Sequence, residues 1–162
     1  MRILHVGDPA VVPALRALGH DVLAADELCP LLAVPGRPVD VRLVHREVAP
    51  EAEVLLLVDV LGRHSLVSGV EELPIPRLYW AVGVPIDVAF AAGFQLVLVP
   101  ERAGVPLLHA EGLPARWLPW ADDLETMSAR MAILTDWLAA GIPEHARRPG
   151  AVAPVAEVRR FS

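Results

Sequence analysis

The stretch RLYWAVGVPID, residues 77–87, decides the fold. Residues 77–82, which are apolar or aromatic after Arg77, predict a buried strand, and Gly83-Val84-Pro85 predicts a turn that opens a helix. Two later segments have the same form: QLVLVPER at 95–102 and ARWLPWADD at 115–123. Repeated strand–turn–helix units predict a parallel sheet whose loops gather along one edge, where such folds bind ligands.

The same alternation of predicted strands and helices extends in both directions along the chain. Apolar runs predict further strands at 2–6, 21–25 and 53–60, with helices at 9–18 and 39–48. Residues 61–73 and 103–111 are interpreted as helix or loop, and a long helix is predicted over 123–140. The predicted fold class is therefore α/β: a Rossmann-like three-layer domain at 1–141 with a mostly parallel sheet of about six strands. Residues 142–162 are interpreted as a tail or linker.

Composition excludes several classes of protein. The 162 residues are 54% hydrophobic, which suits strands buried on both faces. No apolar run approaches the roughly 18 residues of a membrane span, and no signal peptide is apparent, so a cytoplasmic location is expected. A lone cysteine, Cys29, fits a reducing compartment. The net charge of −6 argues against nucleic acid, and the absence of lysine excludes Schiff-base and P-loop chemistry.

The first turn argues against a dinucleotide cofactor. A dinucleotide fold needs G-x-G-x-x-G here, but the chain has Gly7-Asp8-Pro9. Asp8 places a carboxylate where a phosphate would sit, and Pro9 removes a backbone N–H donor. We therefore expect no cofactor. Asp8 itself is interpreted either as a helix cap or as a catalytic candidate.

Asp59 ends the most strongly buried strand. A response-regulator receiver carries its phosphoacceptor at this position, but that mechanism also needs a lysine, which the chain lacks. We interpret Asp59 either as the cap of the next element or as a residue that lines a cleft. Among the histidines, whose spacing predicts no metal site, His64 and His109 are candidate general bases near the ligand edge. His5, inside a strand, is interpreted as a core residue.

Other candidates follow the later strands. The pair Glu101-Arg102 lies just past a strand end. We interpret it either as a ligand-binding pair or as a solvated ion pair. Trp120 stands at the turn after the last strand, where an indole stacks on a sugar ring or packs in the core. Asp122 is a further carboxylate at the same edge. These spacings define no catalytic constellation.

Three segments carry a resemblance to a known family. They are YWAVGVP at 79–85, LVPE at 98–101 and WLPWAD at 117–122. Together with the opening MRILHVG, they resemble the N-terminal domain of CgeB-like (spore-protein type) glycosyltransferases, which have the two-domain GT-B fold. The resemblance covers roughly residues 1–123. It implies an acceptor-side domain that binds a sugar or glycan acceptor.

Two departures from this family pattern matter. The family has an aspartate at the position of Gly83, and the chain ends where the second, nucleotide-sugar-binding domain would begin. The expected function is thus a glycosyltransferase-like domain that is not catalytic alone and needs a second domain or partner. The resemblance and the edge positions together give the expected site residues: catalytic Asp8, Asp59 and His109, and substrate-binding Gly7, Gly83, Pro85, Glu101, Arg102, Trp120 and Asp122.

An alternative from another class is a non-enzymatic binding or assembly module. Met127, Met131, Leu134 and Leu138 recur at helical spacing in the last helix. Such a stripe favours either a homodimer through this helix or burial against the chain's own sheet.

Overall fold

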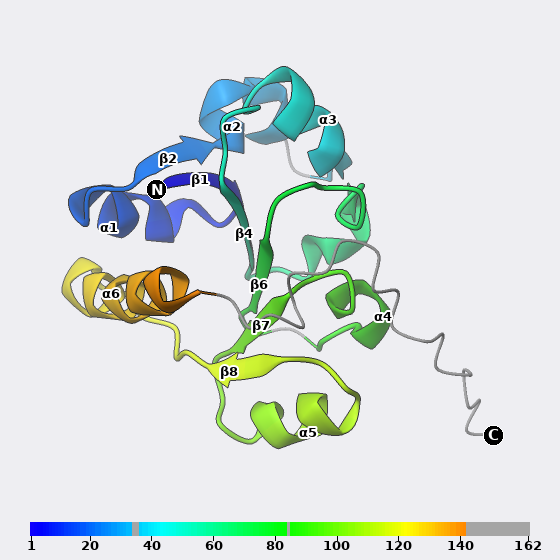
Figure 1. Ribbon diagram of the computed structural model, residues 1–162, viewed down its shortest axis with the longest axis vertical. Coiled ribbons are helices and arrows are strands. Elements are labelled where there is room, and N and C mark those ends of the chain that lie inside the picture. Colours follow the sequence, from blue (N-terminus) through cyan, green and yellow to red (C-terminus); the bar gives the residue numbers. More distant parts are fainter. Residues whose placement is uncertain (34–35, 84, 142–162) are drawn as a thin grey trace.

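The computed structural model describes residues 1–33, 36–83 and 85–141. Within these residues, the main sheet has six strands. Figure 1 shows this sheet at the centre of the protein, between helices. Its strands are β1 (Arg2–Gly7), β2 (Asp21–Ala24), β4 (Val54–Asp59), β6 (Arg77–Ala81), β7 (Leu96–Val99) and β8 (Ala115–Trp117). The predicted α/β fold class is confirmed. The predicted tail, 142–162, lies outside the described residues.

The strand order is β2-β1-β4-β6-β7-β8, and every neighbouring pair is parallel. The chain moves outward from β1 to β2, then returns to β4 on the other side of β1 and proceeds away from it. The order therefore reverses between β1 and β4. In open α/β sheets, the loops diverge at such a switch point and leave a crevice.

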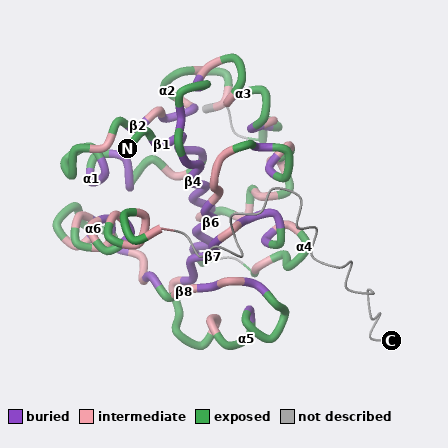
Figure 2. Tube along the Cα trace, viewed as in Figure 1, coloured by how far each residue is buried: buried purple, intermediate pink, exposed green. Residues whose placement is uncertain are grey.

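Helices cover both faces of the sheet. The 3₁₀ turn η1 (Pro9–Val11), α1 (Val12–Ala17) and α6 (Leu124–Ala140) pack on one face, where α1 and α6 lie side by side (Figure 1). The other face is covered by α2 (Ala25–Leu28), α3 (Val41–Glu47), α4 (Val88–Ala91) and α5 (Gly104–Ala110). Figure 2 shows the buried residues following the central strands between these layers. All six residues of β4 are buried, and the first five, which are all apolar, predict this.

The apolar stripe of α6 is part of this core. Met127, Met131 and Leu134 are buried against the sheet, and Leu138 packs beside them. Asp123 caps the helix by accepting a hydrogen bond from the Thr126 N–H at 2.8 Å. Burial in the chain's own core accounts for the stripe, so the stripe no longer favours a dimer.

A small second sheet was not predicted. β3 (Val39–Asp40) pairs in parallel with β5 (Val67–Ser68), which follows the 3₁₀ turn η3 (Arg63–Leu66). Two-residue strands are too short to show a periodic pattern. This pairing holds the segment after α2 next to the segment after β4, at the carboxyl ends of β1 and β4.

Candidate functional site

A cleft of about 400 Å³ opens at the carboxyl ends of β1 and β4. Three parts of the chain line it: the end of β1 with its turn (residues 6–9), the end of β4 through η3 into β5, and the segment from α2 to β3. It lies at the switch point of the sheet, where ligands bind in folds of this kind. Its charged lining residues are Asp8, Asp26, Arg37, Asp59 and Arg63, with His64 beside them.

Gly7 allows β1 and β4 to meet closely at the floor of the cleft. Its φ is +109°, and a Cβ atom there would lie 1.9 Å from the backbone oxygen of Val58. The same oxygen accepts a hydrogen bond from the N–H of Asp8 at 3.0 Å. Only glycine satisfies both the dihedral angle and the contact. The turn that carries Asp8 is thereby held against β4.

Asp8 is a cap that also lines the cleft. Its Oδ1 accepts a hydrogen bond from the N–H of Ala10 at 2.9 Å, and Pro9 occupies the first position of η1. Its backbone oxygen accepts a hydrogen bond from Nε2 of His5 at 2.8 Å. The predicted cap is present. His5 is fully buried, as expected of a core histidine, and burial lowers its pKa.

Asp59 is the most buried charged group of the cleft, with 4% of its surface exposed. Its carboxylate accepts hydrogen bonds from the N–H groups of Arg63 at 2.9 Å and His64 at 3.2 Å. The hydroxyl of Tyr79, from the next strand, donates to it at 3.4 Å. Burial, together with the charge of Asp59, raises the pKa of Tyr79, so this hydroxyl stays protonated. Asp59 therefore caps η3 and lines the cleft at the same time, which were the two alternatives.

His64 is the histidine that the structure brings to this site. Its Nδ1 lies 3.3 Å from Oδ2 of Asp59, and its ring packs on Phe90 with 5.4 Å between centroids. Its Nε2 lies 3.9 Å from Oδ2 of Asp87. The sequence named both His64 and His109 as candidate general bases near the ligand edge, and it did not separate them because each follows a predicted strand in a loop or helix.

The expected catalytic residue His109 lies elsewhere. It is near the end of α5, where its Nε2 is 3.0 Å from the backbone oxygen of Ala115, the first residue of β8. The first residue of a strand lies at the amino edge of the sheet. His109 is therefore at the edge opposite the cleft, because α5 runs away from the carboxyl edge between β7 and β8.

Gly83 and Pro85 are exposed residues of the loop between β6 and α4, outside the cleft. Gly83 has a φ of +67°, with no atom within 4 Å of the position that a Cβ atom would take. This left-handed conformation gives a local reason for glycine. Backbone geometry by itself therefore explains a glycine at this position.

The other expected site residues follow β7 and β8, on the side of the sheet away from β1. Arg102 lies over the indole of Trp117, with 4.1 Å from Cζ to the ring centroid, and Glu101 is exposed beside it. Trp120 is half-buried and contacts Trp80 edge to face at 5.1 Å, in the core cluster beneath α6. Asp122 is exposed. Of the ten expected residues, only Gly7, Asp8 and Asp59 line the cleft.

Arg37 and Arg63 were not predicted as site residues. Arg63 starts η3, and Arg37 comes from the segment between α2 and β3. Neither forms an ion pair with a carboxylate of the described residues. No local signal marks them, because only the pairing of β3 with β5 brings them to the cleft.

Residues 1–33, 36–83 and 85–141 contain no cluster of three or more histidine, cysteine, aspartate or glutamate side chains placed to hold a metal ion. Nor does this part of the chain include a helix with the length and apolar character needed to cross a membrane.

The fold and the cleft together define a doubly wound α/β domain with a polar ligand cleft at its switch point. Comparison with protein-family models, curated proteins and solved structures found no match to the chain.

Proposed function

We propose that this chain is the acceptor-side domain of a glycosyltransferase-like protein of the two-domain GT-B type. In this proposal the cleft between β1 and β4 binds a sugar or glycan acceptor, and a second domain or partner supplies the nucleotide sugar. The observation that carries the proposal is the switch-point cleft in which Asp8, Asp59 and His64 meet Arg37 and Arg63.

The chemistry of the lining suits a ligand rich in hydroxyl groups. A sugar hydroxyl both donates and accepts hydrogen bonds, and the cleft offers carboxylate acceptors together with guanidinium donors. Its volume of about 400 Å³ lies within the range of small-molecule pockets, roughly 300–1,000 Å³. The apolar residues Leu32, Leu57 and Leu66 line the same cleft. They offer a surface for the C–H faces of a sugar ring.

The turn after β1 argues that the nucleotide is held elsewhere. A pyrophosphate needs free N–H groups at a helix start, but Pro9 has none. The N–H of Ala10 already donates to Asp8, whose negative charge would repel a phosphate. The resemblance of residues 79–85, 98–101 and 117–122 to CgeB-like enzymes supports the same division of roles.

Titration calorimetry on this chain tests the division of roles. We expect no nucleotide sugar to bind more tightly than millimolar, and micromolar binding would contradict the acceptor-side assignment.

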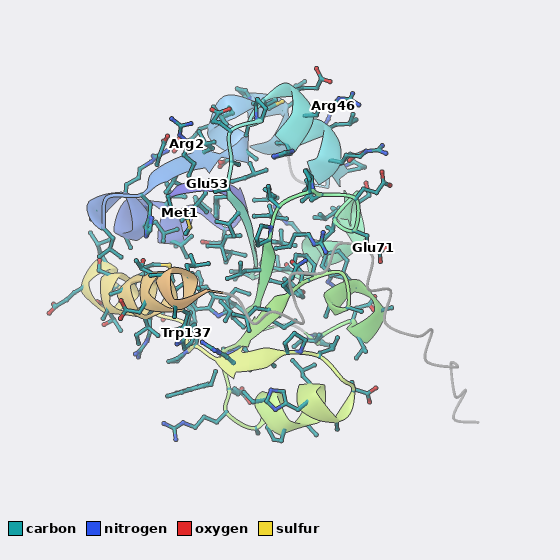
Figure 3. The ribbon with its side chains drawn as sticks, in the orientation of Figure 1. Met1, Arg2, Arg46, Glu53, Glu71 and Trp137 are labelled. Carbon is teal, nitrogen blue, oxygen red and sulfur yellow. The ribbon has the colours of Figure 1, made fainter. Side chains whose placement is uncertain are left out.

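Binding of a panel of mono- and disaccharides, measured by NMR chemical shifts, tests the acceptor site. A sugar that binds the wild type should bind Arg63→Ala more weakly and Arg46→Ala with unchanged affinity. Arg46 is a fair control because it is an exposed arginine on α3, outside the cleft (Figure 3). Equal loss in both variants, or no binding by any sugar, would sink the proposal.

A further inference from the structure

The charged groups that line the cleft differ in how they are satisfied. Each of its three carboxylates already accepts a hydrogen bond from a backbone N–H close by in the chain. These pairs are Asp8 with Ala10, Asp26 with Glu27, and Asp59 with Arg63. Local backbone donors of this kind satisfy a carboxylate without a cationic side chain.

The two cations of the cleft have no such partner. Within the described part of the chain, the guanidinium groups of Arg37 and Arg63 neither donate a hydrogen bond to another protein group nor form an ion pair. The exposed Arg46, by contrast, pairs with Glu47. Both cleft arginines are exposed, and a guanidinium is always charged in proteins. The cleft of this chain, whose net charge is −6, thus offers two positive charges to a ligand.

The backbone that carries these two arginines is held in place. The N–H of Arg63 donates to Oδ1 of Asp59 at 2.9 Å. Arg37 precedes Pro38, which favours an extended backbone at the arginine. Arg37 leads into β3, Arg63 leads through η3 into β5, and these two strands pair in parallel. The arginines therefore reach the cleft from the same end of the small sheet.

We propose that the acceptor carries an anionic group, a carboxylate or a phosphate, and that Arg37 and Arg63 bind it. This inference rests on the proposed function and specifies the class of the acceptor: an acidic or phosphorylated sugar. A guanidinium presents N–H donors in a planar fork that matches two oxygens of a carboxylate or a phosphate. The anionic group lies at the small sheet, and hydroxyl groups of the sugar lie toward Asp8.

The distribution of charge in the cleft explains this orientation. Asp8 repels an anion, but it belongs to the turn after β1, whereas both arginines belong to the segments that lead into the small sheet. Hydrogen bonds between charged groups are about twice as strong as those between neutral groups. An anionic group should therefore raise the affinity of a sugar at least about tenfold over that of its neutral parent.

Matched sets of sugars test the proposal by chemical-shift titration of the ¹⁵N-labelled chain. Each set contains a neutral hexose, its uronate and its phosphate ester at the same carbon, in the glucose, galactose and mannose series. Members of a set differ only at that carbon, so a difference in affinity reports on the anionic group. We expect an anionic member of at least one set to bind about tenfold more tightly than the neutral hexose, or better. Preference for the uronate identifies a carboxylate ligand, and preference for the ester identifies a phosphate.

Two variants and a control assign this preference to the arginines. Arg37→Gln and Arg63→Gln each remove one charge and keep an amide donor, and both positions are exposed, so the fold should be unaffected. The ratio of the neutral to the anionic dissociation constant should fall at least about fivefold in each variant. Arg46→Gln removes the same charge from an exposed site outside the cleft and should leave the ratio unchanged.

The outcomes separate this inference from the proposed function. If the neutral hexoses bind as tightly as their anionic forms, the inference is wrong while the proposed function stands. The same holds if the preference survives in either cleft variant or falls equally in Arg46→Gln. If no sugar of these sets or of the panel above binds, the proposed function falls and the inference falls with it. The presence or absence of sugar binding thus tells the two failures apart.

Discussion

Replacement of Gly7 by alanine is the sharpest test of the packing that forms the cleft. The new Cβ would lie 1.9 Å from the Val58 oxygen and 2.8 Å from its carbonyl carbon. Both are backbone atoms of the central strand, so neither can rotate away. The same oxygen accepts the Asp8 N–H, so a shift of β4 would also weaken this hydrogen bond. The change therefore forces β1 and β4 apart at the switch point.

The expected cost has two parts. A non-glycine residue held at a φ of +109° costs about 1–3 kcal/mol of backbone strain. An added methyl group in a packed position costs about 1–3 kcal/mol more. Gly7→Ala should thus lower the free energy of unfolding by about 2–6 kcal/mol. Gly19→Ala is the matched control, because Gly19 has a φ of +85° but no atom within 4 Å of its Cβ position. Gly19→Ala should therefore lower the free energy of unfolding only by its backbone strain, about 1–2 kcal/mol.

Urea unfolding followed by tryptophan fluorescence measures both variants against the wild type. Trp80 is buried in the core, and Trp120 and Trp137 pack against it, so tryptophan emission reports on global unfolding. Gly7→Ala should be the less stable variant by at least about 1 kcal/mol, which is the lower limit of the packing cost. If the two variants differ by less than about 0.5 kcal/mol, the close approach of β1 and β4 does not matter and the reasoning is refuted.

Three further predictions concern other parts of the molecule. Because burial lowers the pKa of His5, the folded protein resists a proton that the unfolded chain accepts, so stability falls as pH drops below about 6.5. Unfolding measured from pH 7.5 to 5 should show this slope, at most about 1.4 kcal/mol per pH unit, reduced in His5→Gln. Gly83→Asp should lower the free energy of unfolding by about 1–2 kcal/mol, through backbone strain alone. If the variant gains sugar transfer in the presence of a partner domain, the rest of the proposed active site is intact. Met131→Ala should cost about 2–5 kcal/mol and Ile133→Ala about 0.5 kcal/mol or less, because only Met131 is buried; equal costs would contradict the placement of α6.

The strands and most helices were predictable because their signals are local. Residues 53–60 are nearly all apolar, which indicates a strand buried on both faces, and β4 occupies residues 54–59. Glycine, proline and aspartate at the turns mark where elements start, as with Asp8 before η1. Asp8 and Asp59 were candidates because the carboxyl ends of parallel strands share one edge.

The sequence by itself determined that the chain alternates strands and helices, and that Asp8 and Asp59 lie at the carboxyl edge. It did not determine which strands are neighbours. Only the tertiary structure placed β1 beside β4, brought Arg37 and His64 to the cleft, and left His109 and Trp120 away from it. The physical reason is that strand order depends on long-range packing between residues far apart in the chain. The site follows from that order, because a crevice forms where neighbouring loops diverge.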